Sequence, residues 1–156
     1  MVGCTMQERP TQSGLYRSNF QTEYMGMKTD LYTLTNANGM EVCFTNFGGR
    51  IVSIIVPDRD GNMLDVCLGH DSIADYIRYG YQGCNFGALI GRYGNRIKEG
   101  KFTLNGVDYQ LTVNDNGNCL HGGFPFWDKV LWDAEIVKTS AGSGVCFTRV
   151  SPDGEQ

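Results

Sequence analysis

Residues 30–56 read DLYTLTNANGMEVCFTNFGGRIVSIIV, and this stretch decides the fold of the chain. Its first six residues are rich in β-formers, residues 36–39 form a turn cluster, and residues 40–47 alternate apolar with polar side chains. This pattern predicts an antiparallel hairpin. Residues 50–56 follow two glycines and predict a third strand.

The rest of the chain continues the strand pattern around a short helix. Apolar side chains at helical spacing predict that helix over residues 71–78, with Asp71 or Ser72 capping its start. Further strands are expected at residues 63–68, on both sides of the Asn-Gly turn within 101–111, and at 130–137 and 144–150. Since 21 glycines stand against 4 prolines, many tight turns are expected. The predicted fold class is all-β.

Length, charge and hydropathy predict a single domain with no nucleic-acid partner and no membrane span. A chain of 156 residues suits one domain. Its 13 basic and 17 acidic residues leave a net charge of −4, and no Lys/Arg cluster is present that would follow a phosphate backbone, so no nucleic-acid partner is expected. No apolar run has the length of a bilayer span, and no membrane span is predicted.

Residues 1–28 are expected to be an N-terminal tail, and residues 29–156 the domain. Gly3-Cys4 resembles the end of a bacterial lipoprotein signal, although neither a charged nor an apolar region precedes it. If this match is real, Cys4 carries a lipid anchor, residues 1–28 are a tether, and the protein lies in the cell envelope or periplasm. The alternative is a disordered tail with an incidental cysteine, in a cytoplasmic protein.

The six cysteines and two histidines show no spacing typical of metal or redox sites. There is no Cys-x-x-Cys pair. Cys43, Cys67 and Cys146 lie inside expected strands, which favours free thiols in the core over disulfides. His70 and His121 lack a third ligand at a diagnostic spacing, so the sequence predicts no metal and no cofactor.

Residues 84–123 hold the candidate functional site. Arg92 and Arg96 stand four apart in a turn that is rich in glycine and also contains Asn95. The two arginines either satisfy carbonyls and carboxylates around a loop, or they act with the neighbouring amide to bind the hydroxyls of a polar ligand. Sugar hydroxyls fit the second reading.

His121 ends a strand-like segment just before two glycines, where the backbone is able to approach a ligand closely. A lone histidine is more often a packed, hydrogen-bonded residue than a catalyst. Its position in a glycine-rich loop favours function. Phe124, Phe126 and Trp127 follow, and they form either a flat apolar face for a sugar or ordinary core.

Four motifs in this order resemble the aldose 1-epimerase, or galactose mutarotase, family. They are NFGGRI at 46–51, GRYGNRI at 91–97, NCLHGG at 118–123 and SPDGE at 151–155. The resemblance runs from about Thr29 to the last residue, and it covers an N-terminal portion of the family only.

The resemblance implies a large antiparallel β-sandwich, the galactose mutarotase-like supersandwich, of which this chain would be an incomplete N-terminal part. It implies an isomerase that interconverts the α and β anomers of hexoses such as galactose or glucose without a cofactor. In that family a glutamate base removes the C1-hydroxyl proton, a histidine acid protonates the ring oxygen, and the opened ring recloses on its other face. By position, Asn95 and Arg96 match the pair that binds the sugar, and His121 matches an auxiliary active-site histidine.

The family's acid histidine, a sugar-binding aspartate and the base glutamate belong to motifs beyond Gln156. Glu155 belongs to the turn motif, and His70 matches no catalytic position. The chain by itself is therefore expected to be inactive, because loss of an essential acid or base costs about 10² to 10⁴ in rate. Two alternatives stay open. One is a non-catalytic carbohydrate-binding module or inactive truncated remnant, and the other is a relative acting on a hexose phosphate, with Arg92 on the phosphate.

Overall fold

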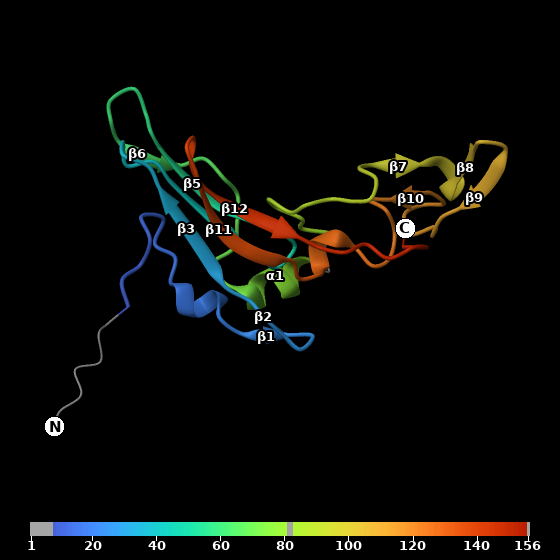
Figure 1. Cartoon of the computed structure of the whole chain (residues 1–156), viewed down its shortest axis with the longest axis horizontal. Helices are drawn as coiled ribbons and strands as arrows, with labels where there is room; N and C mark the ends of the chain where they lie inside the picture. The colour runs from blue at the N-terminus through green and yellow to red at the C-terminus, as the bar shows by residue number, and fades with distance from the viewer. Residues whose placement is uncertain (1–7, 81–82, 156) are drawn as a thin grey trace.

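A four-stranded antiparallel sheet forms the centre of the computed structural model, which describes residues 8–80 and 83–155. Leu31 pairs with Thr45 at one end of its first hairpin. The strands, in spatial order, are β3 (Leu31–Thr35), β4 (Glu41–Thr45), β5 (Arg50–Pro57) and β6 (Met63–Asp65). The predicted hairpin and third strand are confirmed (Figure 1).

The hydrophobic core is built from this sheet, the helix α1 (Ile73–Gly80) and the segment that precedes β3. Its buried members are Leu15, Phe20, Leu31, Cys43, Phe47, Val52, Ile73 and Tyr76. Ser72 caps the start of the helix, because its Oγ accepts a hydrogen bond from the backbone N–H of Asp75 at 3.1 Å. The short helix predicted from its apolar spacing is therefore present, and its apolar side faces the core.

The segment of residues 8–28 differs from the predicted tail. Its elements are the 3-10 helix η1 (Arg17–Phe20) and a hairpin of β1 (Glu23–Tyr24) and β2 (Met27–Lys28). Leu15 and Phe20 of this segment are buried in the core. This part of the expected tail therefore packs on the sheet and the helix. The segment is mostly polar, so its composition did not predict these two core residues. Cys4, the position expected to carry a lipid anchor, lies outside the described residues, within which no helix has the length and apolar character of a membrane span.

The remaining strands form separate two-stranded antiparallel sheets. The pairs are β7 (Arg96–Ile97) with β10 (Cys119–Leu120), β8 (Lys101–Leu104) with β9 (Val107–Gln110), and β11 (Asp133–Thr139) with β12 (Gly142–Thr148). Two further 3-10 helices are η2 (Lys98–Gly100) and η3 (Trp127–Lys129). Figure 1 shows an elongated molecule, with β7–β10 at one end and the central sheet at the other. The predicted all-β, antiparallel class is confirmed.

The cysteines correct one expectation about the core. Cys43 and Cys119 are buried free thiols, and Cys67 is partly buried. Cys146 is also free, but it is exposed. Its strand β12 forms a two-stranded sheet with β11, and such a ribbon leaves much of its surface in solvent. The prediction that Cys146 is a core thiol is therefore wrong.

Arg50, in the NFGGRI motif, joins the central sheet to two distant segments. Its fully buried guanidinium donates to the backbone carbonyls of Phe47 at 3.1 Å, Phe86 at 3.0 Å and Asp128 at 2.6 Å. It also lies over the rings of Phe47 and Tyr76. Burial lowers the pKa of Arg50, and the Asp128 carboxylate opposes that shift. One side chain thus fixes the segments around residues 86 and 128 against the sheet.

Candidate functional site

Asn95 and His121 meet where β7 pairs with β10. The backbone N–H of His121 donates to the carbonyl oxygen of Asn95 at 2.9 Å. In return, the backbone N–H of Asn95 donates to Nδ1 of the His121 ring at 3.0 Å. Both residues adopt positive φ, 63° for Asn95 and 54° for His121, so the chain turns just before β7 and just after β10. The structure therefore brings the GRYGNRI and NCLHGG motifs into direct contact.

The hydrogen bond to Nδ1 fixes the tautomer of His121. A neutral imidazole that accepts at Nδ1 carries its proton on Nε2 and donates there. The residue is half-buried and lines a cavity of about 560 Å³, a size within the range of about 300–1,000 Å³ typical of small-molecule sites. An N–H donor on the wall of such a cavity suits an oxygen atom of a polar ligand.

Arg96 joins this pair and adds an acidic partner. Its Nε donates to Oδ2 of Asp115 at 2.7 Å, and its Nη1 donates to Oδ1 of Asn95 at 3.3 Å. The Arg96 side chain is 52% exposed, and that of Asp115 is 22% exposed. Asn95, Arg96 and His121 thus lie together, with the guanidinium oriented by a carboxylate.

Asp115 and Asn114 are site residues that the sequence did not reveal. Asn114 accepts the backbone N–H of Leu120 at 2.7 Å and donates to the Leu120 carbonyl at 2.9 Å, which fixes the residue before His121. Asp115, as described above, orients Arg96. The available signal was the polar run NDNGN at 114–118, whose last residue is also the first residue of the NCLHGG motif.

The cavity beside His121 has an aromatic wall. Phe124 and Phe126 line it with ring centroids 4.6 Å apart, and Nζ of Lys129 lies 4.4 Å from the Phe126 centroid. Trp127 does not line this cavity and instead packs against Trp132 at a centroid separation of 5.4 Å. Of the three aromatic residues, two therefore face the candidate site and one belongs to the packing behind it.

Arg92 is not part of the Asn95–His121 contact. Its Nε donates to Oγ of Ser151 at 2.9 Å, and its Nη2 donates to the Pro152 carbonyl at 2.6 Å. The turn that it contacts is closed by Glu155, whose pKa is lowered to about 2, mainly by the hydrogen bond from Arg149. These contacts favour a structural role for Arg92.

His70 lies away from these contacts, among aromatic rings. Its ring stacks on Tyr79 at 5.1 Å and meets Tyr76 edge-on at 4.9 Å. Its backbone N–H donates to the Tyr76 hydroxyl at 3.1 Å. In the part of the chain that the structure describes, no group of three or more His, Cys, Asp and Glu side chains is placed to hold a metal ion.

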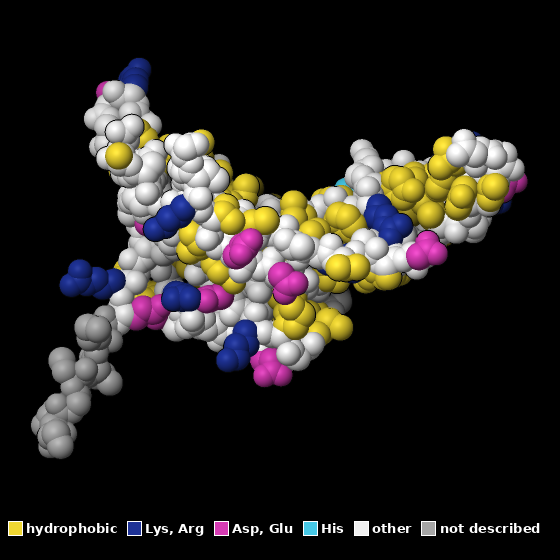
Figure 2. All heavy atoms as spheres, viewed as in Figure 1, with side chains coloured by type: hydrophobic (Ala, Val, Ile, Leu, Met, Phe, Trp, Pro, Cys, Tyr) yellow, Lys and Arg dark blue, Asp and Glu magenta, His cyan; other side chains and the backbone are white. Residues whose placement is uncertain are grey.

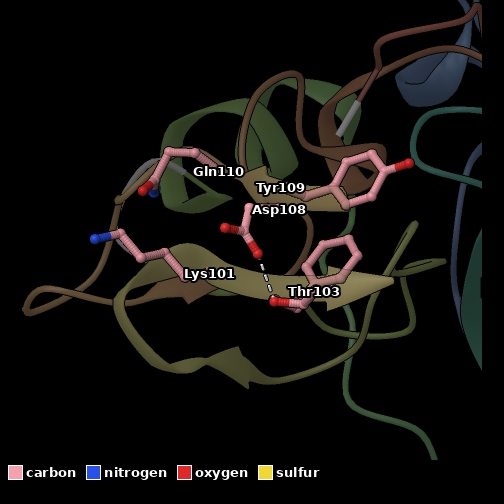
Figure 3. Close-up of a pocket in the computed structure, with 6 residues that line it drawn as sticks. Lys101, Thr103, Asp108, Tyr109 and Gln110 are labelled. Atoms are coloured by element: carbon pink, nitrogen blue, oxygen red, sulfur yellow. Dashed lines mark hydrogen bonds between the residues drawn. The ribbon is translucent and has the colours of Figure 1, made fainter. Parts of the chain in front are cut away.

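A second depression, of about 420 Å³, lies on the β8–β9 hairpin and contains none of the predicted site residues (Figure 3). Within it, Oγ1 of Thr103 donates to Asp108 at 2.6 Å. Hydrophobic side chains gather over this end of the molecule (Figure 2), among them the exposed Leu104, Val107 and Tyr109. The depression on the hairpin therefore lacks the hydrogen-bond donors of Asn95, Arg96 and His121 that lie together at the candidate site.

Known proteins match the chain over most of its length. The family model for aldose 1-epimerase matches residues 30–156. A galactose mutarotase from Bos taurus is 42% identical over 117 residues, which cover 75% of this chain and 32% of that protein. An aldose 1-epimerase from Haemophilus influenzae is 37% identical over 131 residues, covering 84% of this chain and 36% of that protein.

A solved structure agrees with these sequence matches. The galactose 1-epimerase from Lactobacillus acidophilus superposes with a TM-score of 0.72 at 27% identity, covering 86% of this chain and 38% of that one. The chain therefore has the galactose mutarotase-like fold and spans about a third of the length of the curated relatives that it matches. From the family match and the identities with these relatives, it follows that this chain belongs to the aldose 1-epimerase family.

Proposed function

We propose that this chain binds a hexose through Asn95, Arg96 and His121, and that the complete protein interconverts the α and β anomers of that sugar by acid–base ring opening. The observation that supports this most is the pair of hydrogen bonds between Asn95 and His121. They hold the imidazole so that its Nε2–H acts as a donor at a cavity with an aromatic wall.

In this proposal His121 donates to a sugar oxygen and polarises it, and Arg96 binds sugar hydroxyls. A guanidinium held by Asp115 loses little conformational freedom when it binds, which favours selective recognition. Phe124 and Phe126, whose rings meet edge-on at an interplanar angle of 66°, offer an apolar wall to the sugar ring. Family membership supports galactose and glucose as the first sugars to test, since the relatives include galactose mutarotases.

Ring opening needs a base for the C1-hydroxyl proton and an acid for the ring oxygen. The carboxylate beside the candidate site, Asp115, is paired with Arg96 at 2.7 Å, and Nδ1 of His121 already accepts a hydrogen bond from the backbone N–H of Asn95. Because Asp115 and His121 already use these atoms in hydrogen bonds, the site is better suited to binding a sugar than to transferring protons. We therefore propose that the 156-residue chain binds the sugar without accelerating anomer exchange, and that the acid and base are supplied by the complete protein.

The second candidate function is a non-catalytic sugar-binding protein. The ion pair between Asp115 and Arg96 favours it as well, because it occupies the carboxylate beside the site. The two candidates make the same prediction for binding by this chain. They differ for the complete protein, where polarimetry of freshly dissolved α-galactose gives a faster approach to anomeric equilibrium for an enzyme and an unchanged rate for a binding protein.

Calorimetric titration of the chain with galactose and glucose tests the binding site. The Arg96→Lys variant replaces a planar fork with a point charge, and we expect it to weaken binding by about tenfold. Arg59→Lys is the matched control, because the Arg59 side chain is 93% exposed and makes an ion pair with its neighbour Asp60. Equal affinities for the wild type, Arg96→Lys and His121→Phe would contradict the assignment of the site.

A further inference from the structure

The SPDGE turn is bonded to the loop that carries Asn95. Arg92 lies three residues before Asn95, and its side chain reaches Ser151 at 2.9 Å and the Pro152 carbonyl at 2.6 Å. These partners lie 59 and 60 residues further along the chain. Two of the five guanidinium N–H donors of Arg92 are thus used on this turn.

The turn is itself held closed by a nearly buried carboxylate. Glu155 accepts hydrogen bonds from both Nη atoms of Arg149, one of them at 2.8 Å, and from the Ser151 hydroxyl. The Glu155 side chain is 3% exposed and that of Arg149 is 15% exposed. Ser151 therefore connects Arg92 to Glu155, and the segment Arg149–Glu155 forms one hydrogen-bonded unit, called here the Arg149–Glu155 turn.

The same turn also reaches His121 through packing. The Arg149 guanidinium lies 5.7 Å from the Trp127 ring centroid. Trp127 packs so tightly on Gly91 that a Cβ at Gly91 would lie 2.2 Å from its ring. Gly91 in turn packs on Gly122, where a Cβ would lie 2.2 Å from the Gly91 carbonyl oxygen. Gly122 directly follows His121. The turn is therefore linked by packing, through Trp127, to Gly91 of the GRYGNRI motif and to Gly122 of the NCLHGG motif.

We propose that the Arg149–Glu155 turn positions the sugar-binding loop, with Arg92 and Glu155 as positioning residues that do not touch the sugar. The proposal rests on the sugar site described above. Arg92 anchors the loop immediately after Gly91, and Asn95 at the other end of the loop donates to His121. Without the anchor the loop samples arrangements that lack this bond, and the apparent affinity falls by the fraction of time spent in them.

The test compares Arg92→Ala, Arg92→Lys and Glu155→Gln with the matched control Arg17→Ala. Arg17 is likewise an exposed arginine that hydrogen-bonds through its guanidinium, to Asp30 at 2.7 Å from its Nε, but it lies before the central sheet. Two quantities are measured on the whole chain. The first, without sugar, is the NMR resonances of the Asn95 amide and of the His121 ring nitrogens. The second is the dissociation constant for galactose.

We expect Arg92→Ala and Glu155→Gln to shift the Asn95 amide and the His121 Nδ1 resonances and to weaken galactose binding by about tenfold. Arg92→Lys retains a donor and should restore part of both effects, while Arg17→Ala changes neither, even if its melting temperature falls equally. The proposal is overturned if resonances or affinity in Arg92→Ala match those of Arg17→Ala. If the wild type fails to bind galactose, the proposed function fails, while the sugar-free resonances still decide whether the turn orders the loop.

Discussion

The central sheet and the site-bearing region are held together in different ways. Around β3–β6 the apolar side chains from Leu15 to Tyr76 form one core, and Arg50 is buried against it. In the site-bearing region β8 and β9 are almost wholly exposed, and the site depends on hydrogen bonds made by single side chains such as Asn114. Each such bond contributes only about 0.5–1.5 kcal/mol, so the candidate site should open more readily than the sheet.

Removing Arg50 should have the largest effect, because it breaks the connection between the two regions. The Arg50→Met variant leaves three backbone carbonyls and the buried Asp128 carboxylate without their shared donor. We expect the free energy of unfolding to fall by about 3–5 kcal/mol, because three carbonyl groups lose their donor at a cost of about 1–3 kcal/mol each, while Asp128 keeps its ion pair with Lys129. Urea unfolding measures this loss, and Arg59→Met, at an exposed position, should cost less than about 0.5 kcal/mol. A similar small loss for both variants would show that Arg50 does not join the regions.

Substitutions at Gly91 and Gly94, which lie in one loop, test whether packing at the candidate site changes without a change in the central sheet. In Gly91→Ala the added Cβ would lie 2.2 Å from the Trp127 ring, and we expect a loss of about 1–3 kcal/mol from overpacking, with a changed tryptophan emission spectrum and weakened sugar binding. Gly94→Ala is the matched control, since a Cβ there meets nothing within 4 Å. Circular dichroism should show the sheet retained in both variants. Identical emission and binding in Gly91→Ala and wild type would contradict this packing.

Acid should weaken the Arg149–Glu155 turn. The pKa of Glu155 is lowered from 4.5 to about 2 in the folded chain, so its ion pair stabilises the fold above about pH 4.5, and this contribution is lost as the pH falls towards 2. Glu155→Gln should therefore be less stable than wild type by about 1.5–3 kcal/mol at pH 7. That difference should shrink below pH 4.5 and vanish near pH 2. Denaturation at a series of pH values measures it, and a difference that is independent of pH would rule out the ion pair as its source.

Two buried thiols report the opening of each region separately. Cys43 lies in the central core, and Cys119 lies on β10 beside the candidate site. The two thiols are alkylated with a membrane-impermeant agent at increasing urea concentrations, and the products are followed by mass spectrometry. At a given low urea concentration, Cys119 should be alkylated about ten times faster than Cys43. The exposed Cys146 should react fastest of these three and serves as the reference for an open thiol. Equal rates for Cys43 and Cys119 would mean that both regions open together.

The sequence predicted the strands and the pair of site motifs because both depend on local pattern. Alternation gave β3, β4 and β5, and the GRYGNRI and NCLHGG motifs supplied Asn95, Arg96 and His121, which the structure brings into contact. The core roles of Leu15 and Phe20 were hidden because their neighbours are polar. The hydrogen bonds of Asn114 to Leu120, and those of Arg92 to a turn 59 residues away, depend on tertiary placement, which no local pattern encodes.

Amide hydrogen exchange with and without galactose tests the difference between the two regions most directly. At a galactose concentration of about 100 times Kd, the amides of Asn95 and His121 should exchange up to about 100-fold more slowly, because the sugar stabilises only the closed site. The amides of β4 and β5 should keep their exchange rates, since the sheet is already held by its own core. Slowed exchange confined to the β8–β9 hairpin, or no change at Asn95 and His121, would contradict the sugar site proposed here.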